Sequence, residues 1–242
     1  SALAAEGILA FFLESGFLAV VVLGWDRVSP RLPFFSTVMV ALGAHLSAVW
    51  ILVANSWQQT PAGYRLVEHA GGMRAEIVDF WQVVFNPSTL QRLSHVLSAC
   101  WQAGAFLVLT AAAYWLLRRR HERYALESMR IALPVALAAS LLQLGTGHWS
   151  AVGVWENQPA KLAAFEGHYA ESAPATLWLF GWVDEAEREV DLGLGLPGGL
   201  GLLSTGDPDT PIVGLDAFDE ADRPPVQSVF QTYHLMVAIG MA

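Results

Sequence analysis

Four apolar stretches, each long enough to cross a lipid bilayer as a helix, constrain this chain more than any other feature. A helix needs roughly 20 residues to span about 30 Å of hydrocarbon. The stretches that qualify run from Ala2 to Trp25, Pro33 to Trp57, Leu93 to Leu117 and Ile131 to Val152. A further apolar run begins near Val226. The sequence therefore predicts a protein built largely of membrane-spanning helices.

Composition and charge agree with this prediction. Hydrophobic residues make up 54% of the chain and charged residues 14%, with a mean hydropathy of +0.42. The net charge of -9 is local, because 14 of the 22 acidic residues lie between Ala151 and Val226. The single cysteine, Cys100, lies in an apolar run, which excludes a disulfide framework and a thiolate metal cluster. Since the chain starts without Met and stops inside an apolar run, we expect a fragment of a longer protein.

The predicted fold is all-α, a polytopic transmembrane helical bundle with an extracytoplasmic loop. We expect four transmembrane helices with short cytoplasmic turns over residues 1–150, the loop over 151–226, and the start of a further transmembrane helix over 227–242. Lys and Arg are enriched in short cytoplasmic loops. Two short turns hold most of the basic residues, namely Arg27, Arg31, Arg118, Arg119, Arg120, Arg123 and Arg130. Both turns are therefore expected in the cytoplasm, and residues 58–92 and the acidic segment outside.

Three carboxyl groups along the first span are candidates for proton transfer. An ionisable group inside a span costs about 2.5 to 3.5 kcal/mol, so each one suggests a function. On an α-helix Glu6 and Glu14 would lie roughly 12 Å apart and about 80° around the axis, and Asp26 about 18 Å beyond Glu14. This spacing is typical of a water-bridged path from a cytoplasmic turn. Glu14 is the predicted relay and Glu6 the point of delivery.

Two histidines and one methionine are candidates for a different chemistry. A lone His in a span most often makes an interhelical hydrogen bond, which is the favoured interpretation of His45. His95 and Met236 lie near the outer ends of two spans, and a His and a Met on facing helices can ligate a low-spin haem. Packing remains the ordinary role of a Met in a membrane helix. In the acidic segment, Lys161 and Glu166 lie in a predicted short helix, where a charged pair is most often a solvated surface.

Four motifs together resemble subunit I of the cytochrome bd quinol oxidases. They are "FFLES…GWDR", "LSAVWILVANSWQQTPAGY", "KLAAFEGHY" and "DTPIVGL", in this order. The resemblance covers essentially the whole chain, from the family's third spanning helix into its seventh. It implies a nine-helix bundle that holds a low-spin haem b, a high-spin haem b and haem d, or a second high-spin haem b in place of haem d. It also implies an external quinol-binding loop, the Q-loop, whose short length here leans toward the cyanide-insensitive branch.

The resemblance assigns roles to individual residues. The family's ligands of the low-spin haem fall on His95 and Met236. Its "KLAA-x-E" motif falls on Lys161 and Glu166, which implies contact with quinol or a part in its oxidation and replaces the surface interpretation of this pair.

The family's carboxyl groups fall on the three candidates for proton transfer. Glu6 and Glu14 match the glutamates near the high-spin haems and in the proton path, and Asp26 matches the Asp of "GWDR". Whether Glu6 ligates a high-spin haem or only neighbours it stays open. His234 departs from an Arg found in many members, and His45 from an Asn found in some.

The activity implied is that of an electrogenic quinol:oxygen oxidoreductase of the cytochrome bd ubiquinol oxidase type in a bacterial inner membrane. It would oxidise quinol outside and reduce oxygen to water with cytoplasmic protons. The implied partners are subunit II, in a membrane heterodimer, and small accessory subunits, with no nucleic acid. The alternative is a haemless subunit that conducts protons or serves a structural role, and a visible absorption spectrum separates the two.

Overall fold

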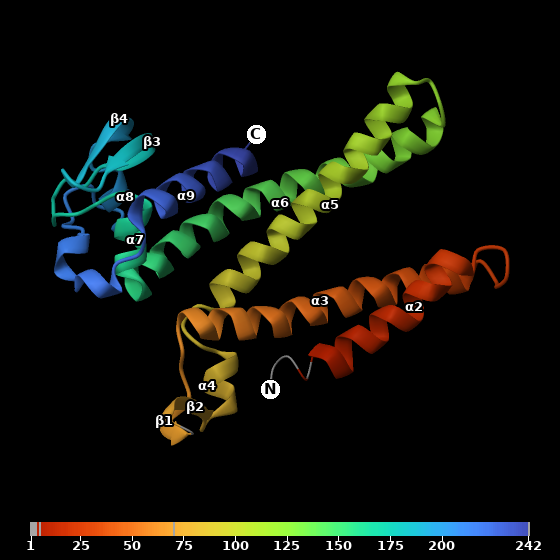
Figure 1. Cartoon of the computed structure of the whole chain (residues 1–242). Helices are drawn as coiled ribbons and strands as arrows, with labels where there is room; N and C mark the ends of the chain where they lie inside the picture. The colour runs from red at the N-terminus through yellow and green to blue at the C-terminus, as the bar shows by residue number, and fades with distance from the viewer. Residues whose placement is uncertain (1–3, 5, 70, 242) are drawn as a thin grey trace. The chain divides into compact units, whose positions relative to one another are not determined.

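The computed structural model describes residues 4, 6–69 and 71–241. The chain forms two compact units, Ser1–Thr146 and Gly147–Ala242, which are described in turn (Figure 1). The N-terminal unit holds most of the long apolar helices, and the C-terminal unit holds the acidic segment and the end of α6.

The N-terminal unit is helical over most of its length. Its helical elements are η1 (Glu6–Phe11, a π-helix), α2 (Phe12–Leu23), α3 (Arg31–Gln59), α5 (Thr89–Leu117) and the larger part of α6 (Glu122–Asn157). Among the described residues, α3, α5 and α6 are long and apolar enough to cross a membrane, and α2 is a shorter apolar helix. Three of the four predicted spans are therefore confirmed in length. The first is divided between η1 and α2.

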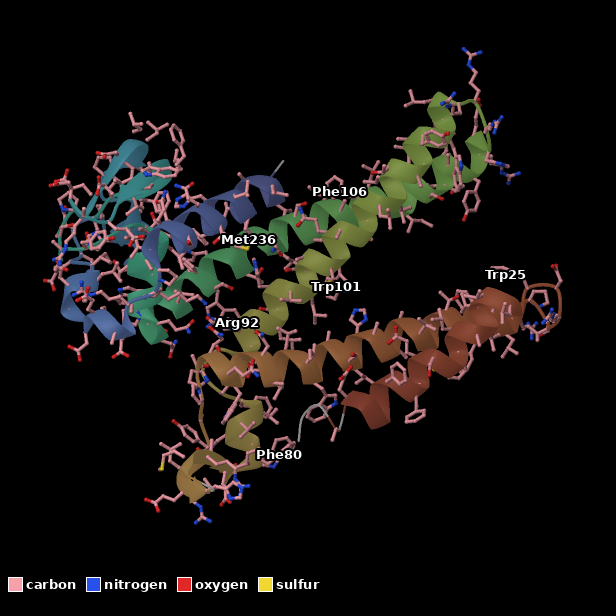
Figure 2. The ribbon with its side chains drawn as sticks, in the orientation of Figure 1. Trp25, Phe80, Arg92, Trp101, Phe106 and Met236 are labelled. Carbon is pink, nitrogen blue, oxygen red and sulfur yellow. The ribbon has the colours of Figure 1, made fainter. Side chains whose placement is uncertain are left out.

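The long helices expose their apolar side chains. Phe34 of α3 is 75% exposed and Phe106 of α5 is 50% exposed, and Figure 2 shows Phe106 projecting from its helix. In a water-soluble helix such side chains would face the core. Exposed apolar side chains around the helices are what contact with lipid or with further membrane helices requires.

A buried polar network joins the end of α3 to the start of α5. Asn86 Nδ2 donates to Ser56 Oγ at 3.0 Å, and Ser56 Oγ lies 2.9 Å from Thr89 Oγ1. Beside them, Thr60 Oγ1 lies 2.6 Å from Ser88 Oγ. Because buried hydroxyl and amide groups are costly when unpaired, this network fixes the start of α5 at Thr89, four residues before the predicted start.

The connection between α3 and α5 is folded. Strands β1 (Tyr64–His69) and β2 (Gly72–Ile77) pair in antiparallel fashion, and the short helix α4 (Phe80–Val84) follows. Asp79 caps α4 by accepting hydrogen bonds from the main-chain N–H groups of Trp81 and Gln82 at 2.9 and 3.1 Å. The all-α prediction is thus correct for the spans and wrong for this connection.

The C-terminal unit also contains a β-hairpin. Its elements are α7 (Pro159–Phe165), β3 (Leu177–Asp184), β4 (Glu189–Leu196), α8 (Gly199–Thr205), the 3₁₀ turns η2 (Leu215–Ala217) and η3 (Glu220–Asp222), and α9 (Val226–Met241). Figure 1 shows α9 beside α7 and β3. A buried core holds them together, formed by Ala163, Ala164, Tyr169, Val183, Leu215, Val226 and Phe230. The short helix predicted in "QPAKLAAFEGHY" is confirmed as α7.

Candidate functional site

His95 lies in a polar cluster between α5 and α6. Its Nε2 is 3.1 Å from Gln143 Nε2, and its Nδ1 is 3.3 Å from Thr146 Oγ1. Ser98, one turn after His95, donates to Gln143 Oε1 at 2.6 Å, which holds the amide in place. The cluster therefore orients the imidazole through both ring nitrogens.

The hydrogen-bond chemistry of the cluster defines the state of His95. An amide nitrogen can only donate, so Gln143 donates to Nε2 and the ring accepts there. Nδ1 then carries the proton and donates to the Thr146 hydroxyl. A neutral imidazole with a lone pair on Nε2 and an oriented Nδ1–H is the form that ligates a metal. His95 thus fits the role of a haem ligand, in which it would hold the iron through Nε2 in place of the Gln143 contact.

Met236 lies on α9 and is labelled in Figure 2. Its side chain is 63% exposed, so the thioether is not committed to packing among the described residues. Exposure of a large apolar side chain is compatible with a haem plane or another helix covering it. His95 belongs to the N-terminal unit and Met236 to the C-terminal unit, and their pairing at one iron stays a prediction.

The predicted proton-path carboxyls have different surroundings. Glu6 Oε1 accepts a hydrogen bond from Ser47 Oγ on α3 at 2.9 Å. Glu14 lies where α2 approaches α3 closely, because a Cβ added to Gly43 would be 3.2 Å from Glu14 Cβ. Asp26 is exposed in the turn after α2. Among the described residues no hydrogen bond joins these three carboxyls to one another, and the relay stays a prediction.

The π-helix η1 changes the expected geometry of the first span. Six residues, from Glu6 to Phe11, have this wider helical turn. The separation of 80° around the axis was calculated for an α-helix over all eight steps from Glu6 to Glu14, so it does not apply. Single π-helical turns occur frequently at functional sites. Here the π-helix sets the direction of Glu6 relative to the rest of the span.

His45 makes the interhelical hydrogen bond that the sequence favours. Trp101 Nε1 on α5 donates to His45 Nε2 on α3 at 2.9 Å, and Figure 2 shows Trp101 on α5. The other ring nitrogen, Nδ1, is 2.7 Å from the Ala41 carbonyl and donates to it. Both nitrogens of a neutral ring are satisfied in this way. This prediction is confirmed, and His45 links α3 to α5.

In the C-terminal unit, Lys161 and Glu166 lie in different surroundings. Lys161 Nζ is 3.5 Å from Gln158 Oε1 and lies over the Phe165 ring, 5.6 Å from its centroid. Glu166 is 2% exposed, and its Oε2 accepts the Trp178 main-chain N–H at 2.9 Å. Burial raises the pKa of Glu166 to about 7, although the Trp178 hydrogen bond acts in the opposite direction. Glu166 can therefore exchange a proton near neutral pH.

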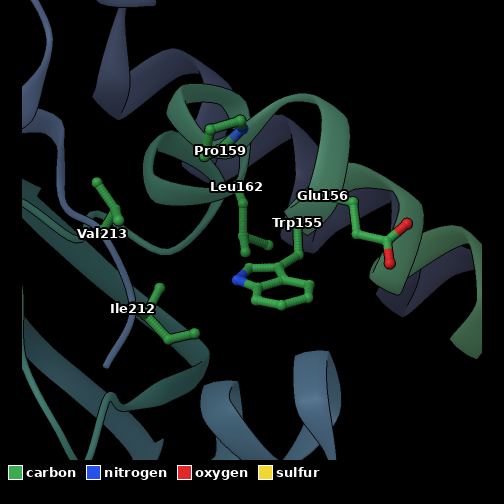
Figure 3. Close-up of a pocket in the computed structure, with 6 residues that line it drawn as sticks. All are labelled: Trp155, Glu156, Pro159, Leu162, Ile212 and Val213. Carbon is green, nitrogen blue, oxygen red and sulfur yellow. The ribbon is translucent and has the colours of Figure 1, made fainter. Parts of the chain in front are cut away.

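A pocket of about 480 Å³ opens in the same unit (Figure 3). Its lining comes from the end of α6, from α7 and from the segment before η2, and consists of Trp155, Glu156, Pro159, Leu162, Ile212 and Val213. The volume is in the range of small-molecule sites, and an apolar wall with one carboxylate is typical of them. Lys161 and Glu166 do not belong to this lining, although Leu162 of α7 does.

Several partners in these sites were not predicted from the sequence. Ser47, Gln143 and Thr146 are polar residues inside apolar runs, and that position was a signal that could have found them. The Trp178 main chain carries no such signal. Its role depends on the hairpin that brings it to Glu166.

Comparisons with known proteins identify the family. The profile of cytochrome bd terminal oxidase subunit I matches residues 1–242, and the chain belongs to this family. The chain is similar to cytochrome bd-II ubiquinol oxidase subunit 1 of Escherichia coli (strain K12), at 35% identity over 98% of the chain and 46% of the relative. It is also similar to a putative cytochrome bd menaquinol oxidase subunit I of Bacillus subtilis (strain 168), at 33% identity over 97% of the chain and 53% of the relative.

A solved structure supports the same conclusion. The bd oxidase of Geobacillus thermodenitrificans superposes with a TM-score of 0.84 at 30% identity, over 99% of this chain and 54% of that one. The chain thus spans about half the length of these relatives. Family membership and the three apolar helices together make this an integral membrane protein.

Proposed function

We propose that this chain is part of a terminal oxidase that oxidises membrane quinol and reduces oxygen to water with cytoplasmic protons. The observation that carries the proposal is the geometry of His95. It is a neutral imidazole oriented inside a span, and its Nε2 lone pair faces the side-chain amide of Gln143, whose place a haem iron would take. The names of the relatives, a ubiquinol and a menaquinol oxidase, support the substrate class.

In this proposal His95 and Met236 hold the low-spin haem b. Haem iron supplies one-electron transfer when it is bound. Thr146 accepts the Nδ1–H of His95 and keeps the ring in the tautomer whose Nε2 carries no proton and can accept. The high-spin haem b, and haem d or a second high-spin haem b in its place, would lie near Glu6.

The C-terminal unit is the proposed site of quinol oxidation. Loss of two electrons from a quinol releases two protons, so a nearby base assists the step. Glu166 is suited to accept one of them, because its pKa of about 7 lets it take up and release a proton near neutral pH. Lys161 would contact the quinol head group. The apolar pocket beside α7 offers space for an apolar part of the quinol, since neither Lys161 nor Glu166 lines it.

Proton uptake is assigned to the first span. Asp26, exposed in its turn, would take protons from the cytoplasm, and Glu14 would pass them to Glu6, whose carboxyl Ser47 orients. The basic residues of the two short turns support a cytoplasmic location for this side, with the Q-loop on the outer side of the inner membrane. Each charge that crosses 100 mV stores about 2.3 kcal/mol. Subunit II would complete the membrane heterodimer, with small accessory subunits around it.

Two electron donors test the quinol assignment in the full oxidase complex. Lys161→Ala should lower quinol-driven oxygen uptake several-fold and leave haem spectra unchanged. Uptake driven by an artificial donor that reduces the haems directly should be spared. A matched control is Arg188→Ala, a basic residue of the same unit whose ion pair with Asp216 is exposed. Equal loss with both donors would contradict a quinol role for Lys161.

A further inference from the structure

One face of α9 is hydrogen-bonded to strand β3. Gln227, Gln231 and His234 are spaced by four and three residues, which places them on the same side of the helix. Each contacts a main-chain group of β3: Val183 N–H donates to Gln227 Oε1 at 3.0 Å, Gln231 Nε2 donates to Gly181 O at 2.8 Å, and His234 Nε2 lies 2.9 Å from Trp178 O. The two glutamine hydrogen bonds and the His234 contact align α9 with β3. The other ring nitrogen of His234, Nδ1, lies 2.8 Å from Phe230 O, and the single N–H of a neutral ring donates to one of these two carbonyls.

The last of these contacts shares its residue with Glu166. The main-chain N–H of Trp178 donates to Glu166 Oε2 at 2.9 Å, and the carbonyl of Trp178 faces His234 Nε2. A single residue of β3 therefore contacts both the buried carboxyl and α9. A shift of the Trp178 main chain would therefore change its contacts with both Glu166 and His234.

The position of Trp178 is itself closely fixed by the hairpin. Its indole ring lies over β4 where Gly193 and Gly195 leave the backbone bare. A Cβ added at these positions would lie 2.6 and 2.8 Å from ring atoms. A side chain at either glycine would displace the ring, so the two glycines of β4 leave the space that the Trp178 ring occupies.

A second contact connects α9 to the residue that precedes Glu166. Tyr233 stacks on Phe165, with ring centroids 4.1 Å apart and planes 4° apart. Phe165 directly precedes Glu166, and Tyr233 directly precedes His234. Consequently α9 borders Glu166 both through Trp178 and through Phe165. Met236 follows two residues after His234 on this fixed segment.

We propose that Gln231 and His234 are positioning residues that tie Met236 to the strand holding Glu166. The proposal rests on the proposed function, in which Met236 ligates the low-spin haem and Glu166 serves quinol oxidation. Gln231 and His234 touch neither group in this scheme. They hold α9 in register on β3, so that the haem ligand and the quinol carboxyl keep fixed places within one unit.

The test uses variants of the full oxidase complex that keep side-chain shape. His234→Phe keeps the ring that stacks on Phe230 and removes both ring nitrogens. Gln231→Met keeps the length and removes the amide. The control is Thr232→Val, since Thr232 is exposed and its hydroxyl bonds to Ser228 O within α9. The measurements are the midpoint potential and spectrum of the low-spin haem and the KM for quinol.

We expect both variants to change the haem redox equilibrium about tenfold, which is about 59 mV for one electron. The KM for quinol should rise several-fold, and turnover with the artificial donor should fall less. Thr232→Val should leave both the midpoint potential and the KM unchanged. His234→Gln keeps a hydrogen-bond donor, so its potential and KM should lie between those of His234→Phe and wild type. If His234→Phe does not assemble, the milder Gln231→Met decides the question.

Two outcomes separate this inference from the proposed function. A Met236→Leu oxidase with an unchanged low-spin haem would overturn the haem assignment itself. If Met236→Leu abolishes the low-spin signal while Gln231→Met leaves both potential and KM as in Thr232→Val, the positioning role is overturned and the haem assignment stands.

Discussion

Replacing Glu166 by Gln removes an ionisable group that the fold keeps buried. In the wild-type chain the Trp178 N–H donates to Glu166 Oε2 at 2.9 Å. A Gln side chain retains an oxygen that can accept this hydrogen bond, but it cannot ionise. Because burial raises the pKa of Glu166 from 4.5 to about 7, the substitution should change both the stability and the quinol kinetics of the oxidase, each with a defined pH dependence.

The stability effect follows from proton linkage. A carboxyl with a raised pKa binds its proton more tightly in the folded state, so wild-type stability falls as pH rises from 4.5 to about 7. At about 1.4 kcal/mol per unit, this rise corresponds to about 3 kcal/mol above pH 7. The weaker hydrogen bond of the neutral amide offsets about 1 kcal/mol. Glu166→Gln should therefore be about 2 kcal/mol more stable than wild type at pH 8 and no more stable at pH 4.5.

The kinetic effect has the opposite sense. If ionised Glu166 accepts the quinol proton, wild-type kcat/KM for quinol should rise about tenfold between pH 6 and 8, because the ionised fraction of a group with a pKa of about 7 rises by that factor. Glu166→Gln should be slower and lack this rise. Thermal unfolding and quinol-driven oxygen uptake of the purified complex, at several pH values, measure the two effects.

The control is Glu171→Gln, since Glu171 is an exposed carboxyl of the same segment. Its melting temperature and its kcat/KM for quinol should change with pH as they do in wild type. The reasoning is refuted if Glu166→Gln keeps the wild-type rise in kcat/KM, or if its melting temperature relative to wild type does not increase with pH.

The remaining predictions concern the N-terminal unit. Glu14→Gln should slow turnover and charge separation in vesicles with normal haem spectra, whereas Glu6→Gln should also alter the spectra of the high-spin haems; full turnover of Glu14→Gln would exclude a relay role. Trp101→Phe should cost about 1 kcal/mol in thermal unfolding, because it removes the donor to His45 Nε2 and keeps an aromatic ring. An unchanged unfolding transition would mean that this hydrogen bond does not stabilise the contact between α3 and α5.

The long spans could be predicted because length and hydropathy alone select a membrane helix. The ends of α5 could not, since Thr89 begins the helix through a polar network with Ser56 that forms only when α3 and α5 meet. The π-helix at Glu6 was missed for a related reason, because an apolar run has the same composition in a π-helix as in an α-helix. The hairpin β3–β4 was missed because its glycines suggest a loop when the packing of Trp178 is unknown.

The candidate site divides in the same way. His95 could be proposed from its residue type within a span, and Glu166 from its motif. Their partners depend on how elements pack: Thr146 meets His95 only at one rotation of α6 against α5, and Trp178 meets Glu166 through its backbone. The sequence therefore points to candidate residues by their type and motif, and not to the groups that orient them.

The most direct test of the central proposal is the reduced-minus-oxidised spectrum of the full oxidase complex with Met236→Leu and, separately, with His95→Ala. Met236→Leu keeps an apolar side chain of similar volume and removes the thioether. We predict that the low-spin haem b signal disappears or becomes high-spin in both variants, with the other haem bands retained. An unchanged low-spin signal in either variant would contradict the assignment of His95 and Met236 as its ligands.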